Sequence, residues 1–190
     1  MKYSVYFDLT LREYPDIPLW DTLGRVWRIV HVAGANTQQI FAVAFPKQMT
    51  TGFSLGAVIR VFAMSLDAAD ALYDSIENTP GIEDLLSGSR VRKVNIENVT
   101  GYEAYVMKRI SGKVDAKFAA DPEKVEMHMQ RLLRQKAQQQ HLPFVRMRSS
   151  TGALFKLVFD RILVDSDSTG APNGYGLSRK DLIAALPIFK

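Results

Sequence analysis

Histidine is the side chain best suited to accept and release a proton near neutral pH, and the chain has three of them. His31 lies four residues after Trp27, on the flank of an apolar helical pattern, so two readings stay open. It is either a histidine at the edge of the core or a general base. His128 stands between two methionines and His141 lies where a helix should end, so both are weaker candidates.

Hydroxyl groups and a phenol gather in the last quarter of the chain. Three consecutive hydroxyl side chains precede a glycine, in the order Ser149-Ser150-Thr151-Gly152. As a bare string this is typical of a polar turn between two strands. Tyr175, followed by a glycine, could equally be an aromatic residue that anchors a last strand, and Phe155 could be core. These short strings alone do not separate structural from functional roles.

A basic face is expected on the helix at 122–140, where Arg131 and Arg134 lie one turn apart. Three further side chains extend this polar face, namely Lys124, Lys136 and Gln138. Such a face fits the phosphates of an RNA stem, but two glutamates on the same helix also fit an ordinary solvated surface.

The elements that would position these residues begin with alternating and helical patterns in the first half of the chain. The expected order is a strand at 3–10, a helix at 19–33, strands at 40–45 and 58–64, a helix capped by Ser65, and a strand at 90–96. The glycine of Gly34-Ala35-Asn36 is expected to end the first helix. The order βαββαβ predicts a ferredoxin-like antiparallel sheet backed by two helices.

The second half reads as a mixture of strands with the basic helix among them. The expected elements are a strand at 105–110, the helix at 122–140, and strands at 144–148, 154–160 and 162–164, followed by a loop at 166–174. We therefore predict an α+β protein with a ferredoxin-like domain at 1–98 and a basic α/β domain at 99–190, for which the resemblance described below implies RNA binding.

Composition limits the classes of function. The chain has 190 residues and no cysteine, which excludes disulfides and thiolate metal sites, and we expect a cytoplasmic protein with no metal, no cofactor and no membrane segment. Residues 1–98 hold nine basic and eleven acidic side chains, a net charge of −2, whereas residues 99–190 hold fifteen and nine, a net charge of +6. The basic excess in the second half favours a polyanion site there.

Several motifs occur in a fixed order along the chain. They are His31, Phe45-Pro46, Arg131-Leu132-Leu133-Arg134, Leu142-Pro143-Phe144-Val145, Arg148-Ser149-Ser150-Thr151-Gly152 and Tyr175-Gly176-Leu177-Ser178. In this order and approximate spacing the chain resembles the CRISPR repeat-processing endoribonucleases of type I-F systems. The resemblance covers most of the chain, which makes it far more specific than any one motif.

The resemblance implies a metal-independent enzyme that binds the stem-loop of a CRISPR repeat, cuts at the 3′ base of the stem and stays on the product, beside backbone subunits of a type I-F effector complex. It implies that His31 is the general base, that Ser149 or Ser150 holds the ribose, and that Tyr175 orients the imidazole or the nucleotide. The RNA-binding residues would be Arg109, Arg131, Arg134, Gln138, Arg148, Ser150 and Phe155. The alternative is a structural subunit that binds an RNA hairpin without cutting it, in which His31 belongs to the core.

Overall fold

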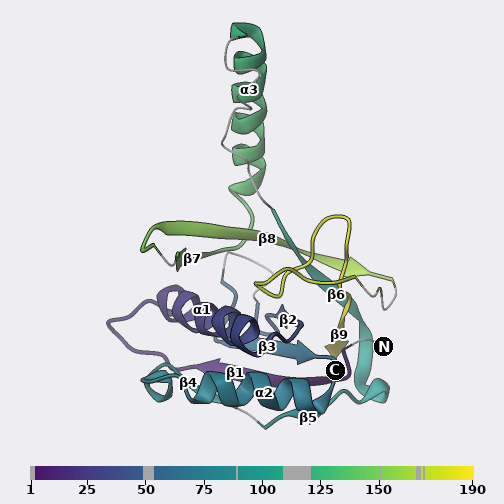
Figure 1. The fold of residues 1–190 in the computed structure, drawn as a ribbon. Coiled ribbons are helices and arrows are strands. Elements are labelled where there is room, and N and C mark those ends of the chain that lie inside the picture. The colour runs from purple at the N-terminus through teal and green to yellow at the C-terminus, as the bar shows by residue number, and fades with distance from the viewer. Residues whose placement is uncertain are drawn as a thin grey trace.

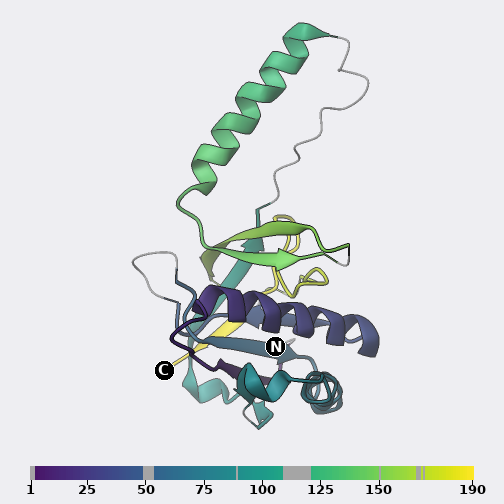
Figure 2. The same cartoon turned by 90° about the vertical axis from the view of Figure 1, so that its left-hand side faces the viewer.

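The computed structural model describes residues 3–48, 54–88, 90–108, 121–149, 151–165, 168 and 170–190. Two of the expected site residues, Arg109 and Ser150, lie outside these residues. In the described part, two antiparallel sheets lie one above the other, and a helix extends away from both (Figures 1 and 2). The α+β fold class is confirmed.

The first sheet has the strand order β2-β3-β1-β4, with antiparallel pairing between neighbours, as the ferredoxin-like fold requires. Its elements are β1 (Val5–Leu11), α1 (Leu19–Thr37), β2 (Phe41–Ala44), β3 (Val58–Ala63), α2 (Leu66–Glu77), β4 (Leu86–Gly88) and β5 (Arg92–Lys93). Alternate residues of β1 are buried, and Phe7 makes an edge-to-face contact with Tyr73 of α2 at 5.2 Å between ring centroids. Ser65 caps α2 as predicted, since its Oγ accepts a hydrogen bond from the N–H of Ala68.

Helix α1 is longer than the sequence predicts. It continues through Gly34 to Thr37 and ends at Gln38, whose φ is +56°. Gly34 serves packing here, because a Cβ on it would lie 2.2 Å from Cε1 of Phe41. Gly34, which the sequence predicts to end the helix, instead lets β2 approach the helix.

The strand predicted at 90–96 is also wrong in its limits. Two short strands, β4 and β5, pair with opposite ends of β1 in its place. The buried residue of this edge is Leu86, which pairs with Leu11, and a Cβ on Gly88 would lie 2.3 Å from the hydroxyl of Tyr73. Sequence periodicity missed the edge because so short a strand gives almost no alternating pattern.

The second sheet has the order β7-β8-β6-β9. Its strands are β6 (Val99–Met107), β7 (Phe144–Arg148), β8 (Leu154–Val164) and β9 (Leu186–Phe189). The strand expected at 105–110 begins earlier, at Val99, and the two runs expected at 154–164 form one continuous strand. Arg161 does not interrupt β8, because its guanidinium pairs with Glu103 of the neighbouring β6.

Helix α3 (Pro122–Gln139) projects from the second sheet and stands clear of both sheets (Figures 1 and 2). Asp121 caps it, accepting a hydrogen bond from the N–H of Lys124 at 3.3 Å, and Pro122 occupies its first turn. The predicted helix at 122–140 is therefore confirmed.

The core is continuous between the two sheets. Trp27 of α1 is fully buried and makes edge-to-face contacts with Phe45 at 5.1 Å and Phe159 of β8 at 5.5 Å. Phe45 in turn contacts Tyr105 of β6 at 5.3 Å. The division of the chain into domains at 98/99 stays a prediction.

Candidate functional site

The motif that contains Tyr175 lies on a segment that joins the two sheets. The N–H of Val43 in β2 donates to the carbonyl of Gly176, while Ser178 exchanges backbone hydrogen bonds with Tyr105 and Met107 of β6. Backbone hydrogen bonds thus attach this segment to both sheets, and they hold Tyr175 in a defined position between the sheets.

Glycine at 176 has a physical cause. Its φ is +77°, a region that L-residues with a side chain rarely adopt. A Cβ there would also lie 2.8 Å from Cε2 of Phe41 and 2.9 Å from Cγ1 of Val43. Glycine at 176 is therefore needed so that the backbone can pass beside β2, directly after the candidate site residue Tyr175.

Asn173 holds the turn before this pair, and the sequence analysis missed it. Its Oδ1 accepts hydrogen bonds from the backbone N–H groups of Tyr175 and Leu177, at 2.8 and 3.3 Å. Its backbone carbonyl accepts from the N–H of Gly176 at 2.8 Å. The Pro-Asn-Gly sequence at 172–174 was the available signal, because asparagine commonly bonds the backbone of its own turn.

His31 lies on α1 beside this turn, half-buried. Its Nδ1 is 2.6 Å from the carbonyl oxygen of Gly174, and its ring stacks on that of Tyr175 with centroids 4.3 Å apart and planes 21° apart. A carbonyl can only accept, so Nδ1 carries the hydrogen of this bond, and a neutral ring then has its lone pair on Nε2. The contacts fix the ring and leave Nε2 as a proton acceptor.

Trp27, one turn before His31, ties the same segment to the helix. Its indole N–H donates to the carbonyl of Tyr175 at 2.9 Å. The register of α1 thus buries the tryptophan and places the imidazole at the edge of the core. His31, Asn173 and Gly174 also line a cavity of about 210 Å³ between the end of α1 and the turn.

Phe155 extends the aromatic group from a third element, β8. It is half-buried, and its ring makes an edge-to-face contact with Tyr175 at 6.4 Å. The structure thus brings together three of the expected residues: His31 contacts Tyr175, which contacts Phe155, although His31 lies more than a hundred residues before the other two.

Ser149 lies in the turn between β7 and β8, where its hydroxyl has structural partners. Its Oγ accepts a hydrogen bond from the N–H of Ala153 at 3.0 Å and lies 2.9 Å from Oγ1 of Thr151. Gly152 completes the turn with a φ of +83°. Within the described residues, Ser149 forms no hydrogen bond with His31 or Tyr175, so the choice between Ser149 and Ser150 stays open.

The basic residues expected to bind RNA are solvent-exposed. Arg131, Arg134 and Gln138 lie exposed on α3, and Arg148 is exposed at the end of β7. In the described part of the chain, the guanidinium groups of Arg131 and Arg134 form no ion pair with a carboxylate. Within the described residues, no ion pair therefore competes with an anionic ligand for these two guanidinium groups. The weaker histidine candidates, His128 and His141, lie on α3 and just after it.

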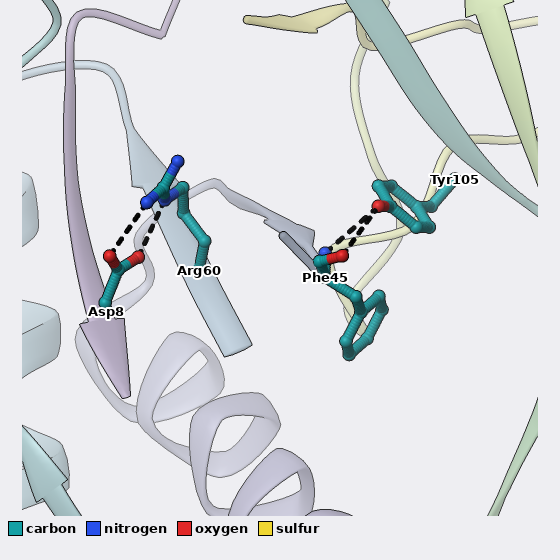
Figure 3. A network of polar contacts seen from close by, with 4 residues as sticks. All are labelled: Asp8, Phe45, Arg60 and Tyr105. Carbon is teal, nitrogen blue, oxygen red and sulfur yellow. Dashed lines mark hydrogen bonds and ion pairs between the residues drawn. The ribbon is translucent and has the colours of Figure 1, made fainter. Parts of the chain in front are cut away.

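Buried polar contacts hold the second sheet against the first (Figure 3). The hydroxyl of Tyr105 donates to Glu103 at 3.1 Å and accepts from the N–H of Phe45 at 3.1 Å. Burial, and then the charge of Glu103, raises the pKa of Tyr105, so its phenol stays protonated. Arg161 neutralises Glu103 at 2.5 Å, and within the first sheet Asp8 and Arg60 form a second ion pair.

Two observations concern other classes of site. Among the residues the structure describes, no group of three or more histidine, aspartate or glutamate side chains could hold a metal ion. Of the helices in the described ranges, none combines the length and the apolar character needed to cross a membrane.

Comparison with known proteins gives one strong match. A family model described as "CRISPR-associated protein (Cas_Csy4)" matches residues 6–189. Among curated proteins, none matches the chain.

The solved structures that match the chain are distant from it in sequence. One is described as an RAMP protein binding different RNA substrates (TM-score 0.39, 9% identity, 98% of this chain and 99% of the other). A second is a Cas6-related protein from Pyrococcus furiosus (TM-score 0.38, 11% identity, 97% and 98%). A third is the CRISPR endoribonuclease Cse3 bound to a 19-nucleotide RNA (TM-score 0.34, 11% identity, 97% and 100%).

Proposed function

The chain belongs to the Csy4 family of CRISPR-associated proteins, the repeat-processing endoribonucleases that its motifs resemble, and from this we propose that it cleaves CRISPR precursor RNA without a metal. The cut falls at the 3′ base of the repeat stem. The protein then stays on the 3′ hairpin of the guide RNA as a subunit of a type I-F effector complex. The observation that carries the proposal is the fixed imidazole of His31, bonded through Nδ1 to Gly174 and stacked on Tyr175.

The proposed reaction is an internal transesterification. Nε2 of His31 takes the proton of the ribose 2′-hydroxyl, and the 2′ oxygen attacks the adjacent phosphorus. The bond from phosphorus to the 5′ oxygen of the next nucleotide breaks, leaving a 2′,3′-cyclic phosphate, and the departing oxygen takes a proton from water to become a 5′-hydroxyl. The hydrogen bond to Gly174 keeps the hydrogen on Nδ1 throughout, so that Nε2 is the nitrogen that takes up the proton.

The other site residues position the RNA in this proposal. Tyr175 fixes the plane of the imidazole, Ser149 or Ser150 holds the ribose, and Phe155 stacks on the terminal base pair of the stem. Stacking of a base on an aromatic side chain contributes about 1–3 kcal/mol. Phe155 is suited to this because its ring is half-exposed and already borders Tyr175.

In this proposal, basic residues bind the stem of the RNA hairpin. Arg131, Arg134 and Gln138 on α3, together with Arg148, contact the phosphates and groove of the stem, and Arg109 reads a base pair. The support is the projection of α3 from the body, which lets a duplex lie along the helix without meeting the first sheet (Figure 1).

A second candidate is a subunit that binds the hairpin without cutting it. The contacts of His31 are consistent with this function, because a histidine that only anchors a turn to a helix would make the same hydrogen bond and ring contact. Both functions predict hairpin binding, and only the first predicts cleavage that depends on Nε2.

The experiment is cleavage of a labelled CRISPR repeat hairpin in EDTA, beside a copy with 2′-deoxyribose at the cut site. We expect the first to be cut to a cyclic phosphate and the second to be bound intact. His31→Ala should abolish cleavage. His31→Asn is the matched variant, because its amide can still donate to Gly174 but has no group in the place of Nε2. Cleavage by His31→Asn at the wild-type rate contradicts the base assignment, and tight binding without any cleavage by the wild type favours the second candidate.

A further inference from the structure

A groove lies on the other flank of α1, and of its lining residues only Arg148 has a role in the function proposed above. It measures about 610 Å³ and lies between α1, the end of α2 and the hairpin of β7 and β8. We call it the α1–β7 groove. Gly24 lets its walls meet, because a Cβ there would lie 2.2 Å from the carbonyl oxygen of Arg146. The close approach of α1 to β7 thus forms the floor of the groove.

The groove is strongly basic. Arg25 and Arg28 line it from α1, and Arg146 and Arg148 line it from β7. The lining includes a single carboxylate, Asp21, which is paired with Arg25 at 2.8 Å, so the formal charge of the lining is +3. Among the described residues, the guanidinium groups of Arg28 and Arg148 form no ion pair or hydrogen bond. An anion at Arg28 or Arg148 would therefore not have to displace a partner among these residues.

An exposed aromatic ring borders the same groove. Trp20 is 49% exposed, and the guanidinium carbon of Arg146 lies 5.0 Å from its ring centroid. Leu154, on the opposite side, is 65% exposed. Arginines along a groove with a planar ring at the rim are the features that bind single-stranded nucleic acid, by phosphate contact and base stacking.

The groove borders the candidate active site. Arg28 precedes His31 by one turn of α1, and Arg148, the last residue of β7, directly precedes Ser149. A strand that leaves the base of a bound stem thus meets the groove directly. This continuity favours RNA over an acidic protein as the occupant.

We propose that the α1–β7 groove binds the single-stranded RNA that flanks the repeat stem. The inference rests on the proposed function, since it places the stem at His31, and it adds a second contact surface to the precursor. The groove holds the strand through phosphates at Arg28 and Arg146 and through a base at Trp20. Its contribution is independent of the nucleotide sequence of the flank.

The test compares hairpin RNAs with and without a short oligouridine extension at the 5′ or the 3′ end, all carrying 2′-deoxyribose at the cut site. The variant is Arg28→Gln/Arg146→Gln. The control is Arg92→Gln/Lys93→Gln, which removes the same charge from exposed positions of β5 outside the groove. Affinities are measured across a range of salt concentrations.

We expect the extension to tighten binding by about tenfold in the wild type and in the control but not in the groove variant, as for one charged hydrogen bond or more. The slope of log affinity against log salt for the extended RNA should fall by about 1.4 in the groove variant, since each phosphate contact on a single strand contributes about 0.7. The unextended hairpin should bind all three proteins equally.

Two results overturn the inference: an extended RNA that binds no better than the hairpin, or a gain from the extension that survives in the groove variant. The second result would place the flanking strand on another surface of the protein. Failure of the wild type to cut a ribose hairpin counts against the proposed function instead. Free oligouridine, without a hairpin, tests the groove even then, because its salt-dependent binding should be lost in the groove variant.

Discussion

The side chain of Asn173 offers a sharp test of how the candidate site is held together. It accepts hydrogen bonds from the N–H groups of Tyr175 and Leu177, and its Nδ2 lies 3.4 Å from the sulfur of Met107. Alanine at this position leaves two partly buried N–H groups without an acceptor. It also frees the turn that presents the Gly174 carbonyl to the imidazole.

The expected loss follows from these contacts. A hydrogen bond within a protein contributes about 1 kcal/mol net, so Asn173→Ala should lower the free energy of unfolding by about 2 kcal/mol. Cleavage should slow by more than the loss of folded protein explains, since a displacement of about 1 Å in a catalytic group can cost about 100-fold in rate. Asn173→Asp is the matched variant, because its carboxylate accepts the same two hydrogen bonds.

Urea unfolding, followed by tryptophan fluorescence, measures the first effect, and single-turnover cleavage where both proteins are folded measures the second. The aspartate variant should remain near the wild type in both. An alanine variant that loses less than about 0.5 kcal/mol, within the usual range of surface substitutions, and cuts at the wild-type rate refutes the reasoning. Equal damage in the aspartate variant would show that hydrogen-bond acceptance is not what matters.

Three further changes have definite expected outcomes. Arg161→Met leaves the Glu103 carboxylate, which is 5% exposed, without its cation, and should cost about 3–5 kcal/mol in urea unfolding, most of it recovered when Glu103→Leu is added. Gly176→Ala puts a Cβ against β2 at a φ of +77° and should lower stability by at least about 1–2 kcal/mol, the cost of the left-handed conformation alone. Arg131→Gln/Arg134→Gln should leave the melting temperature unchanged, because both side chains are exposed, and should lower the salt slope of hairpin binding by about 1.8, if each contacts one phosphate.

The ferredoxin-like half could be predicted from the sequence because its strands and helices carry strong periodic patterns. Besides the short edge strands β4 and β5, the errors fall at residues whose partner lies in another element of the fold. Gly34 continues a helix because Phe41 packs on it, and Arg161 continues a strand because Glu103 neutralises it. Local patterns contain neither partner.

The candidate site divides in the same way. His31, Tyr175 and Phe155 could be named from motif order, and the structure brings them into contact. Their roles in RNA binding and cleavage stay predictions. The sequence could not predict the hydrogen bonds of Asn173. Nor could it predict that Arg28 and Arg146 line the same groove, since this depends on which elements pack together.

The segment at 173–178, which connects the two sheets, also has a consequence for synthesis of the protein. A chain emerges from the ribosome from its N-terminus, so His31 and its helix are made long before the carbonyl of Gly174 and the ring of Tyr175. A nascent chain that ends before this segment has an imidazole without its hydrogen-bond acceptor or its stacking partner. In the proposed function, cleavage competence therefore arises late, after nearly all of the described chain has been translated, and we expect no RNA cutting by incomplete chains.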